Sequence, residues 1–331
     1  MRTARLHGIA DLRVGNEPPP AAAAGETLVR VTAVGICGSD LHWYEDGAIG
    51  DAKLGEPLIP GHEGAGEIVT GPRRGERVAI DPAIPCEACR ACRDGYRNLC
   101  YHVRFAGHGV TDGMLREILP WPTHRLHPLP DNVSDAAGAL LEPLAVALWA
   151  LDLGPVPFGG TAAVVGCGPV GLLLIQVLRA AGVSRVLAVE PLAHRRDAAA
   201  KWGADEILDP YPAADPPDFA AHGVDVAFEM AGNDDAVHIA MAATRPGGRV
   251  VLGGIPGSDT TTFRASLARG KELTIAMVRR SNETHPRAID LAARGVVELD
   301  PLVSSRVPLT EAPAAFADAQ RRTGLKVIIT P

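Results

Sequence analysis

Two styles of hydrophobic and polar patterning follow one another along the chain. Residues 26–34 (ETLVRVTAV) alternate apolar and polar side chains, which predicts a half-buried β-strand. Further strands are predicted at 65–69 and 75–81, each bounded by glycine or proline residues that favour turns. The chain up to about Leu144 is therefore expected to form a mostly β domain.

The pattern changes near Ala145, where short apolar runs begin to alternate with helical repeats. Predicted strands lie at 161–165, 183–189, 224–229, 249–252 and 273–278, and predicted helices lie at 172–181, 193–202 and 234–243. Strands that alternate with helices favour a parallel, doubly wound sheet of the α/β class. Ligands of such sheets bind at the carboxyl ends of the strands.

After about Glu283 the sequence returns to the first style, with helices predicted at 287–293 and 308–320 and a closing strand at 326–330. We therefore expect a discontinuous catalytic domain, residues 1–144 and 284–331, with a cofactor domain at 145–283 inserted into it. A cleft between two such domains is a common ligand site. The candidate chemistry of the first domain would face a cofactor held by the second.

Composition and charge narrow the class of protein. A net charge of −7, a sequence pI near 5.9 and the absence of a run of Lys or Arg argue against nucleic acid as a partner. The first residues lack the apolar core of a secretion signal, so we expect a cytoplasmic protein. Residues 154–178 carry no charge, but their glycines and prolines favour a buried strand, turn and helix over a membrane span.

The stretch from Gly35 to Glu67 carries the candidate chemistry. Cys37, His62 and Glu63 are a thiol, an imidazole and a carboxylate, which are ligand types of Zn²⁺, and three protein ligands leave the fourth position free for catalysis. The alternative is a buried thiol and an unrelated loop histidine. Three glycines around the His-Glu pair, at 61, 64 and 66, favour the site because they indicate a close approach of the backbone to something.

Short polar side chains follow Cys37. Ser39 and His42 could pass a proton, and Asp40 could orient a metal-bound imidazole from behind.

Four cysteines form a second candidate metal site. They follow the pattern C-x2-C-x2-C-x7-C, which allows four thiolates to surround one structural Zn²⁺ with no open position: Cys86, Cys89, Cys92 and Cys100. An iron–sulfur cluster and disulfides are the alternatives. The intervening loop is rich in Arg and Asp and lacks the apolar shell of a redox centre, so structural zinc is favoured, in a lobe at about residues 82–101.

A glycine-rich turn follows the strand predicted at 161–165. Gly166, Gly168 and Gly171 make the pattern G-x-G-x-x-G between a strand and a helix, which is the required setting for dinucleotide binding. Glu190 ends the next strand, where an acid accepts hydrogen bonds from the adenosine ribose and repels a 2′-phosphate. NAD is therefore expected over NADP, although Arg195 and Arg196 are close enough in sequence to pair with a phosphate.

With these motifs in place, the chain resembles the zinc-dependent medium-chain alcohol dehydrogenases over essentially its whole length. Within them it is most similar to the sorbitol (L-iditol 2-) dehydrogenase group. The matching passages are GICGSDLHWYEDGAIGD, PGHEGAGEI, the four-cysteine lobe, LLEPLAVAL, GCGPVGLL and PLVSSRVPLTEAPAAF. The resemblance implies a GroES-like catalytic domain, a Rossmann cofactor domain, two Zn²⁺ per chain, NAD, and a homodimer or homotetramer.

The resemblance also assigns roles by position. Cys37, His62 and Glu63 match the catalytic zinc ligands, Glu142 matches the acid near the metal, and Ser39 and His42 match the proton relay. Cofactor contacts are expected at the three motif glycines and at Val170, Glu190, Arg195, Gly253, Val278 and Arg279. The implied reaction is oxidation of a secondary alcohol of a polyol or related sugar to a ketone, with hydride transfer to NAD.

At two positions the sequence differs from the polyol group, and both differences affect which substrate is expected. Trp43 and Arg280 stand where sorbitol dehydrogenases often carry tyrosine, and both are candidate substrate contacts together with Glu142 and Arg279. A further arginine could bind the carboxylate of an aldonate, or it could be a surface residue. Threonine and simple secondary alcohols remain alternative substrates, and a non-catalytic zinc- and nucleotide-binding relative is the alternative outside enzymes.

Overall fold

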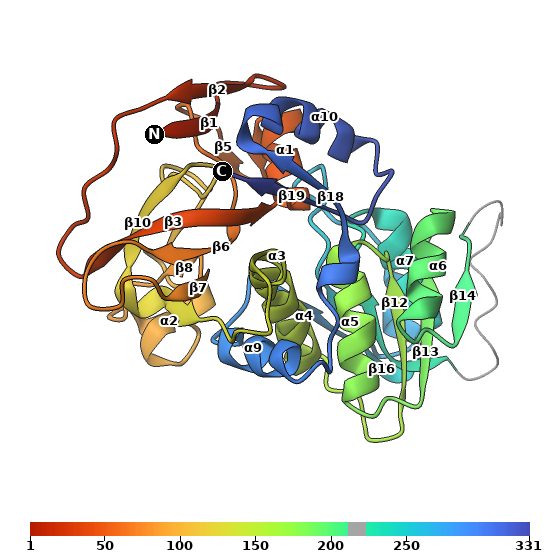
Figure 1. The fold of residues 1–331 in the computed structure, drawn as a ribbon. Coiled ribbons are helices and arrows are strands. Elements are labelled where there is room, and N and C mark those ends of the chain that lie inside the picture. The colour runs from red at the N-terminus through yellow and green to blue at the C-terminus, as the bar shows by residue number, and fades with distance from the viewer. Residues whose placement is uncertain (211–222) are drawn as a thin grey trace. The chain divides into compact units, whose positions relative to one another are not determined.

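The computed structural model describes residues 1–210 and 223–331. The chain divides into two compact units. Unit 1 comprises Met1–Ala145 and Asn282–Pro331, and unit 2 comprises Val146–Ser281. Figure 1 traces the elements of each unit along the chain.

A seven-stranded sheet forms the frame of unit 1. Its strands follow the order β11-β7-β6-β3-β19-β18, and β10 also pairs with β3. All neighbouring strands are antiparallel except β18 and β19, which run in parallel. The strands are β3 (Glu26–Gly35), β6 (Glu63–Ile68), β7 (Arg77–Ile80), β10 (Ile118–Pro122), β11 (Leu126–Pro128), β18 (Val303–Pro308) and β19 (Lys326–Thr330).

Smaller elements complete unit 1. Three two-stranded sheets pair β1 (Arg2–Leu6) with β2 (Leu12–Asn16), β4 (Ala48–Ile49) with β5 (Ala52–Lys53), and β8 (Ala83–Ile84) with β9 (Arg104–Phe105). The helices are α1 (Gly38–Asp46), α2 (Arg90–Arg93), α3 (Asp135–Ala139), α9 (His285–Ala293) and α10 (Ala312–Gln320), and α4 (Leu141–Leu153) begins in unit 1 and continues into unit 2.

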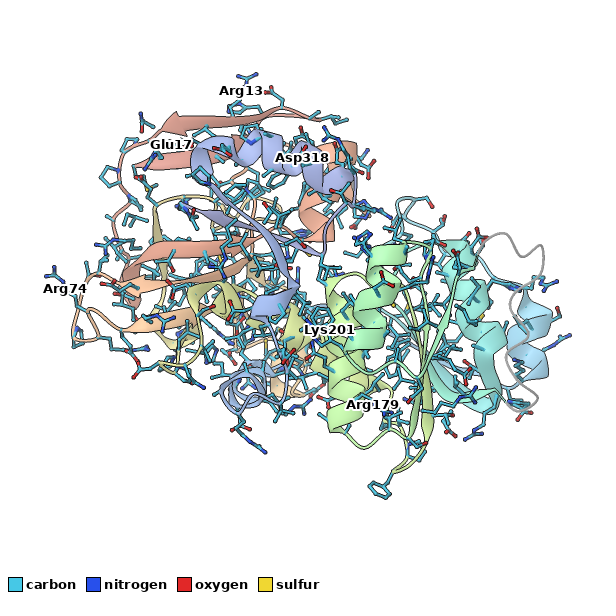
Figure 2. The ribbon with its side chains drawn as sticks, turned by 45° about the vertical axis from the view of Figure 1, so that its right-hand side comes forward. Arg13, Glu17, Arg74, Arg179, Lys201 and Asp318 are labelled. Carbon is cyan, nitrogen blue, oxygen red and sulfur yellow. The ribbon has the colours of Figure 1, made fainter. Side chains whose placement is uncertain are left out.

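The alternation along β3 explains the core of unit 1. Val29 and Val31 are buried while Arg30 between them is exposed, so one face of the strand packs inward. Trp43 of α1 and Phe316 of α10 bury their rings in the same cluster. Charged side chains such as Arg13, Arg74 and Asp318 lie on the surface (Figure 2).

Unit 2 is a six-stranded parallel sheet with the order β14-β13-β12-β15-β16-β17. Helices α5 and α6 cover one face and α7 covers the other (Figure 1). The strands are β12 (Thr161–Val165), β13 (Arg185–Val189), β14 (Glu206–Leu208), β15 (Val224–Glu229), β16 (Thr244–Leu252) and β17 (Thr274–Met277), and the helices are α5 (Pro169–Ala180), α6 (Ala193–Lys201), α7 (Asp234–Ala243) and α8 (Ala265–Gly270).

The strand order reverses between β12 and β15, because the chain leaves β12 on one side for β13 and returns on the other side as β15. Such a switch point is where doubly wound sheets bind ligands. The turn from β12 into α5 holds the glycine motif at this point. The expected architecture, a mostly β domain and a doubly wound parallel sheet, is therefore confirmed.

The structure differs from the sequence prediction in its helices. No helix was expected between Gly35 and His62, but residues 38–46 form α1 with Cys37 as its N-terminal cap, and the helix expected from 308 begins at Ala312. Among the described residues no helix combines the length and the apolar character that a bilayer span needs. The uncharged segment 154–178 instead contains β12 and most of α5.

Candidate metal centre and cofactor site

The ends of neighbouring strands bring the first group of candidate residues together. β3 ends at Gly35, which lies opposite Glu63 at the start of β6. Cys37 follows as the N-terminal cap of α1. The two segments that carry the candidate ligands therefore meet where β3 ends and β6 begins, and the rigid strands fix their positions.

Cys37, His62 and Glu63 each offer one ligand atom, and these atoms lie within 4.8 Å of one another. His62 and Glu63 are buried and Cys37 is half-buried. The donor set fits Zn²⁺, and three protein ligands leave the fourth position for a substrate oxygen. The N-terminus of α1 favours the negative charge that a thiolate ligand carries.

Asp40 holds the loop and the imidazole in place. Its carboxylate accepts hydrogen bonds from the backbone N–H groups of Cys37 and Gly61, both at 3.0 Å. One of its oxygens also lies 3.4 Å from Nδ1 of His62. This is the geometry expected for a carboxylate that orients a ligand histidine.

The charges around His62 affect its protonation. Burial lowers the pKa of His62, but the nearby Asp40 and Cys37 outweigh burial and raise it well above its usual value. A metal ion that binds His62 must therefore displace a proton.

The glycines around His62 have a structural explanation. A Cβ on Gly64 would overlap the sulfur of Met114, and a Cβ on Gly66 would overlap the carbonyl oxygen of Arg30. Gly61 has a φ of +92°, which favours glycine. The close approach predicted from the sequence is thus an approach to neighbouring parts of unit 1, and it adds no argument for a metal.

The two candidate proton carriers, Ser39 and His42, are both half-buried and have different neighbours. The Ser39 hydroxyl is 3.4 Å from Nε2 of His62, so it lies beside the candidate metal ligands. His42 lies one turn further along α1, where its Nδ1 is 3.0 Å from a carboxylate oxygen of Asp46 and its side chain is 24% exposed. A partly exposed histidine is suited to exchange a proton with solvent.

Glu142 lies in the first turn of α4 and is 6% exposed. Burial raises its pKa to about 7, His62 opposes the rise, and Glu63 adds to it. These interactions place the carboxyl group near the other candidate ligands. It is able to change its protonation state near neutral pH.

Lys326 is a residue that sequence reasoning missed. It begins β19, is 3% exposed, and forms an ion pair with Glu63. Burial alone would lower the pKa of Lys326, but Glu63 and Cys37 raise it, so the ammonium stays charged. A lysine at a strand end is usually solvated, and only the pairing of β19 beside β3 reveals its position.

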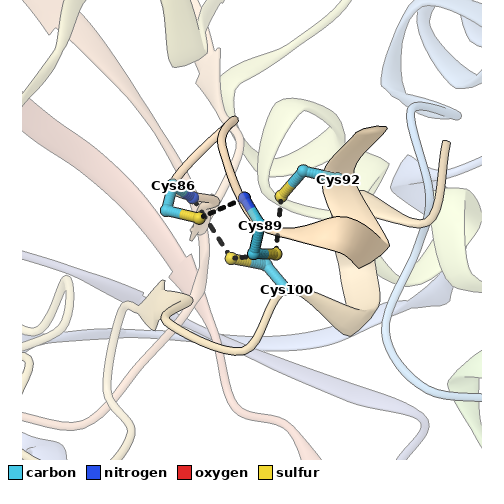
Figure 3. A group of neighbouring side chains, drawn as sticks. All are labelled: Cys86, Cys89, Cys92 and Cys100. Carbon is cyan, nitrogen blue, oxygen red and sulfur yellow. Dashed lines mark hydrogen bonds between the residues drawn. The ribbon is translucent and has the colours of Figure 1, made fainter. Parts of the chain in front are cut away.

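The four cysteines of the predicted lobe also converge. Their sulfur atoms lie within 4.8 Å of one another and point toward a common centre (Figure 3). The Sγ of Cys89 lies 3.5 Å from that of Cys92 and 3.9 Å from that of Cys100. Two sulfurs bound to one tetrahedral zinc at ~2.3 Å are about 3.8 Å apart.

This geometry separates the alternatives for the lobe. All six cysteines of the chain are free, and these sulfur–sulfur distances are far longer than a disulfide bond, so the disulfide alternative is wrong. In an iron–sulfur cluster the thiolates bind different irons, which would place the sulfurs farther apart. The donor set therefore fits a single structural zinc.

The electrostatics of the lobe also favour a cation. Backbone N–H groups lower the pKa of Cys89 to about 6, whereas burial and the neighbouring sulfurs raise the pKa of Cys92 to about 12. Four thiolates this close repel one another, and a divalent cation at their centre would offset that repulsion.

A third group with metal-ligand side chains occurs in unit 1 at Asp81, His127 and His285. The carboxylate of Asp81 already receives a hydrogen bond from Arg125 at 3.1 Å, and the two imidazole rings stack 5.4 Å apart. Burial lowers the pKa of His127, and His285 adds to the effect. An arginine-paired carboxylate beside a neutral imidazole accounts for the group without a metal ion.

In unit 2 the three motif glycines have distinct roles. Gly166 has a φ of +95°, and a Cβ on Gly171 would overlap the carbonyl oxygen of Gly166. A Cβ on Gly168 would meet only a guanidinium nitrogen of Arg195, at 3.8 Å. The turn is therefore tight at its ends and open in its middle, which is the form that lets a pyrophosphate approach the backbone at the N-terminus of α5.

Glu190 closes this turn from the end of β13. Its carboxylate accepts hydrogen bonds from the backbone N–H groups of Cys167 at 2.7 Å and Leu192 at 3.0 Å, and it is 3% exposed. Arg196 binds the carbonyl oxygens of Glu190 and Pro191 and pairs with Asp209. Arg195, beside Gly168, is thus the arginine that lies nearer the glycine turn.

The remaining candidates lie at the ends of other elements. Gly253 and Val278 follow β16 and β17, Val170 lies in the first turn of α5, and Arg279 is exposed beside the half-buried Arg280. Trp43 is 1% exposed, with its ring against the edge of His108 in unit 1. Trp43, a candidate substrate contact, is therefore part of the packed interior of this unit.

Comparison with known proteins matches both units. Residues 23–131 match the alcohol dehydrogenase GroES-like domain, and residues 169–294 match the zinc-binding dehydrogenase family. A probable D-xylulose reductase A of Aspergillus clavatus is 35% identical over 98% of this chain and 95% of its own length. Sorbitol dehydrogenase of Bacillus subtilis is 33% identical over 100% of this chain and 97% of its own length.

Among solved structures, L-idonate 5-dehydrogenase of Escherichia coli superposes with a TM-score of 0.93 at 27% identity, over 100% of this chain and 98% of that one. The chain therefore belongs to the zinc-dependent medium-chain alcohol dehydrogenase superfamily, and it is an NAD(P)-dependent zinc dehydrogenase of the alcohol and polyol type that acts on CH–OH groups.

Proposed function

We propose that the protein oxidises a secondary alcohol group of a polyol or related sugar to a ketone and transfers the hydride to NAD. The observation that carries the proposal is the convergence of Cys37, His62 and Glu63 into a three-ligand set. The similarity to a sorbitol dehydrogenase and a probable D-xylulose reductase supports a polyol substrate. The catalytic domain would comprise 1–144 and 284–331, and the cofactor domain 145–283.

In this proposal each side chain near the candidate ligands has a task. Bound zinc would polarise the substrate hydroxyl and lower its pKa. Cys37, His62 and Glu63 would hold the ion, and Asp40 would keep the His62 ring in its ligand orientation. The buried Glu142, whose pKa is raised to about 7, would adjust the charge beside the ion as the substrate ionises.

The proton of the substrate hydroxyl needs a route to solvent. Ser39 lies beside His62, and the partly exposed His42 pairs with Asp46 further along the same helix. We assign Ser39 the first acceptance of the proton and His42 its release to solvent. The contact between Nδ1 of His42 and Asp46 would hold the imidazole in place along this route.

Unit 2 would bind the cofactor through the glycine turn. The open space at Gly168 would admit the pyrophosphate, and Val170, Arg195, Gly253, Val278 and Arg279 would line the rest of the site. The carboxylate of Glu190, in addition to its two backbone bonds, would accept the ribose hydroxyls.

We predict that NAD⁺ exceeds NADP⁺ in kcat/KM by roughly tenfold or more, because the charge of Glu190 repels a 2′-phosphate. Glu190→Gln removes this charge and should narrow the ratio. Arg196→Gln is the matched control, since its guanidinium already binds Asp209 and backbone carbonyls. Steady-state kinetics that favour NADP⁺ in the unsubstituted protein would show that attraction of the 2′-phosphate by Arg195 outweighs its repulsion by Glu190.

An aldonate is the second candidate substrate. The structural likeness to L-idonate 5-dehydrogenase favours it, and so does the presence of two consecutive arginines, Arg279 and Arg280. A guanidinium can bind a carboxylate through two parallel hydrogen bonds. Arg280→Met should then raise KM for an aldonate much more than KM for an uncharged polyol.

A substrate panel with NAD⁺ tests the proposed reaction. It should include polyols, aldonates, threonine and simple secondary alcohols, with NADH formation as the measurement. We expect the highest kcat/KM for a polyol with a secondary hydroxyl next to its terminal carbon. Turnover confined to threonine or to simple alcohols would contradict the polyol assignment. The absence of turnover with every alcohol in the panel would contradict the proposed dehydrogenase reaction.

Assembly and compartment are also part of the proposal. The outer strand of the unit 2 sheet, β17, exposes Ile275 and Met277, at 37% and 67%. An apolar strand at a sheet edge favours pairing with a second copy, so we propose a homodimer or homotetramer. The free cysteines of the metal lobe support a reducing, cytoplasmic location.

A further inference from the structure

Lys326 contacts both segments that carry the candidate zinc ligands. Its Nζ donates a hydrogen bond at 2.8 Å to the carbonyl oxygen of Ile36, the residue before Cys37. The same ammonium forms an ion pair with Oε2 of Glu63. The side chains of Lys326 and Glu63 are only 2% and 1% exposed, so both contacts are shielded from water.

The sheet positions this lysine. Ile328 and Ile329 of β19 pair with Gly35 and Val34 at the end of β3, and Ile36 donates a backbone hydrogen bond to Val327 at 3.1 Å. On the opposite side of β3, Gly35 pairs with Glu63. Lys326 and Glu63 therefore begin on different neighbours of one strand, and their side chains meet across its end.

Gly35 provides the space in which they meet. A Cβ at this position would overlap Oε2 of Glu63 and would come within 2.8 Å of Cε of Lys326. Gly35 is buried at the end of β3, directly after the buried Ala33 and Val34. Because Gly35 has no side chain, Glu63 and Lys326 have the space to form their ion pair.

We infer that Lys326 is a positioning residue for the metal centre, which ties the Cys37 segment to Glu63 and so holds both ligands in place for the ion. By binding Oε2 it would leave the other oxygen of Glu63 for the metal. The inference rests on the proposed function, because it takes the three-ligand set as the zinc site.

The alternative is that Lys326 competes with the metal ion for Glu63. A cation that holds Glu63 could also weaken its bond to zinc, and removing the lysine would then tighten metal binding. Groups that orient metal ligands from behind change metal affinity by ~10–100-fold when they are removed. The sign of the change in affinity therefore decides between positioning and competition.

Cobalt(II) titration of the full chain tests this inference. A chelator first removes the catalytic ion while the four-cysteine site keeps its zinc, and absorption spectra then follow Co²⁺ binding. We expect Lys326→Met to lower the Co²⁺ affinity about 10–100-fold and to alter the d–d bands. Lys326→Arg, which keeps the charge and the donors, should recover most of the affinity and the original spectrum.

Two further variants guard against misfolding as an explanation. Gly35→Ala keeps every charge but fills the space between Glu63 and Lys326, so it should weaken Co²⁺ binding as Lys326→Met does. Lys271→Met is the matched control, because that lysine binds the carbonyl oxygens of Ala242 and Thr244 in unit 2. This control should bind Co²⁺ like the unsubstituted protein.

The outcomes separate this inference from the proposed function. If Cys37→Ala abolishes Co²⁺ binding while Lys326→Met binds as tightly as the unsubstituted chain, or more tightly, the positioning role is overturned and the zinc site stands. Unchanged affinity in Gly35→Ala would overturn it too. If Cys37→Ala binds Co²⁺ normally, the three-ligand site itself is wrong.

Discussion

Replacing Cys37 or His62 by alanine is expected to remove one of two bound zinc ions and to lower kcat/KM at least about a thousandfold, while the fold remains. The two side chains contribute two of the three ligand atoms that lie within 4.8 Å of one another. The loss is large because the metal supplies several kcal/mol of stabilisation to the charge that develops on the substrate oxygen.

Metal analysis, circular dichroism and NAD⁺-dependent turnover measure the three parts of this expectation. Cys167→Ala is a matched control, since Cys167 is a buried free cysteine in unit 2 whose hydrogen bond to Glu190 uses only its backbone N–H. The control should keep both zinc ions. Turnover that survives complete loss of the catalytic zinc in Cys37→Ala would refute the assignment.

Replacing Cys92 by serine is expected to release the other zinc and to destabilise unit 1 by roughly 3–5 kcal/mol, a fraction of the ~10–16 kcal/mol with which structural zinc sites bind their ion. Cys92 is buried, and its sulfur lies 3.5 Å from that of Cys89. Without the ion, four sulfurs that face one another lose the charge that holds them together.

Thermal unfolding and metal analysis of the same sample test this second prediction. The catalytic zinc should remain, because Cys37, His62 and Glu63 form a separate group. A Cys92→Ser protein that keeps two zinc ions and an unchanged melting temperature would show that the lobe holds no structural metal. Iron in the purified protein would favour the iron–sulfur alternative instead.

The α/β half of the fold followed closely from the sequence. The predicted bounds of the strands at 161–165 and 224–229 and of the helix at 234–243 match the structure to the residue. Buried parallel strands are continuous apolar runs, and the glycines and capping residues between them mark their ends clearly. Helix α7, for example, begins after Asn233, whose side chain accepts the N–H of Ala236.

Helix α1 was missed because its signals are local and polar. It begins with Gly38 and Ser39, which favour turns, and its apolar residues do not form a long stripe. The feature that starts it is a hydrogen bond from the N–H of Cys37 to the carboxylate of Asp40, one half of a capping box. Such a bond is hard to distinguish in sequence from the polar surroundings of a metal loop.

The residues of the candidate site also differ in how far the sequence predicts them. The ligand types of Cys37, His62 and Glu63, together with their match by position to the catalytic zinc ligands of the family, group them, because metal chemistry restricts the donors. Lys326 is far from them in sequence, and only the order β6-β3-β19 brings it to Glu63. Contacts that depend on strand order lie beyond the reach of local patterns.

The most direct test of the central claim is NAD⁺ reduction with a polyol, measured on one protein sample as its catalytic zinc is removed by a chelator and then restored. We predict that activity falls in proportion to the loss of one zinc ion per chain and returns with its replacement, while the zinc of the four-cysteine lobe stays bound. Full activity in protein that has lost the zinc held by Cys37, His62 and Glu63 would contradict the account.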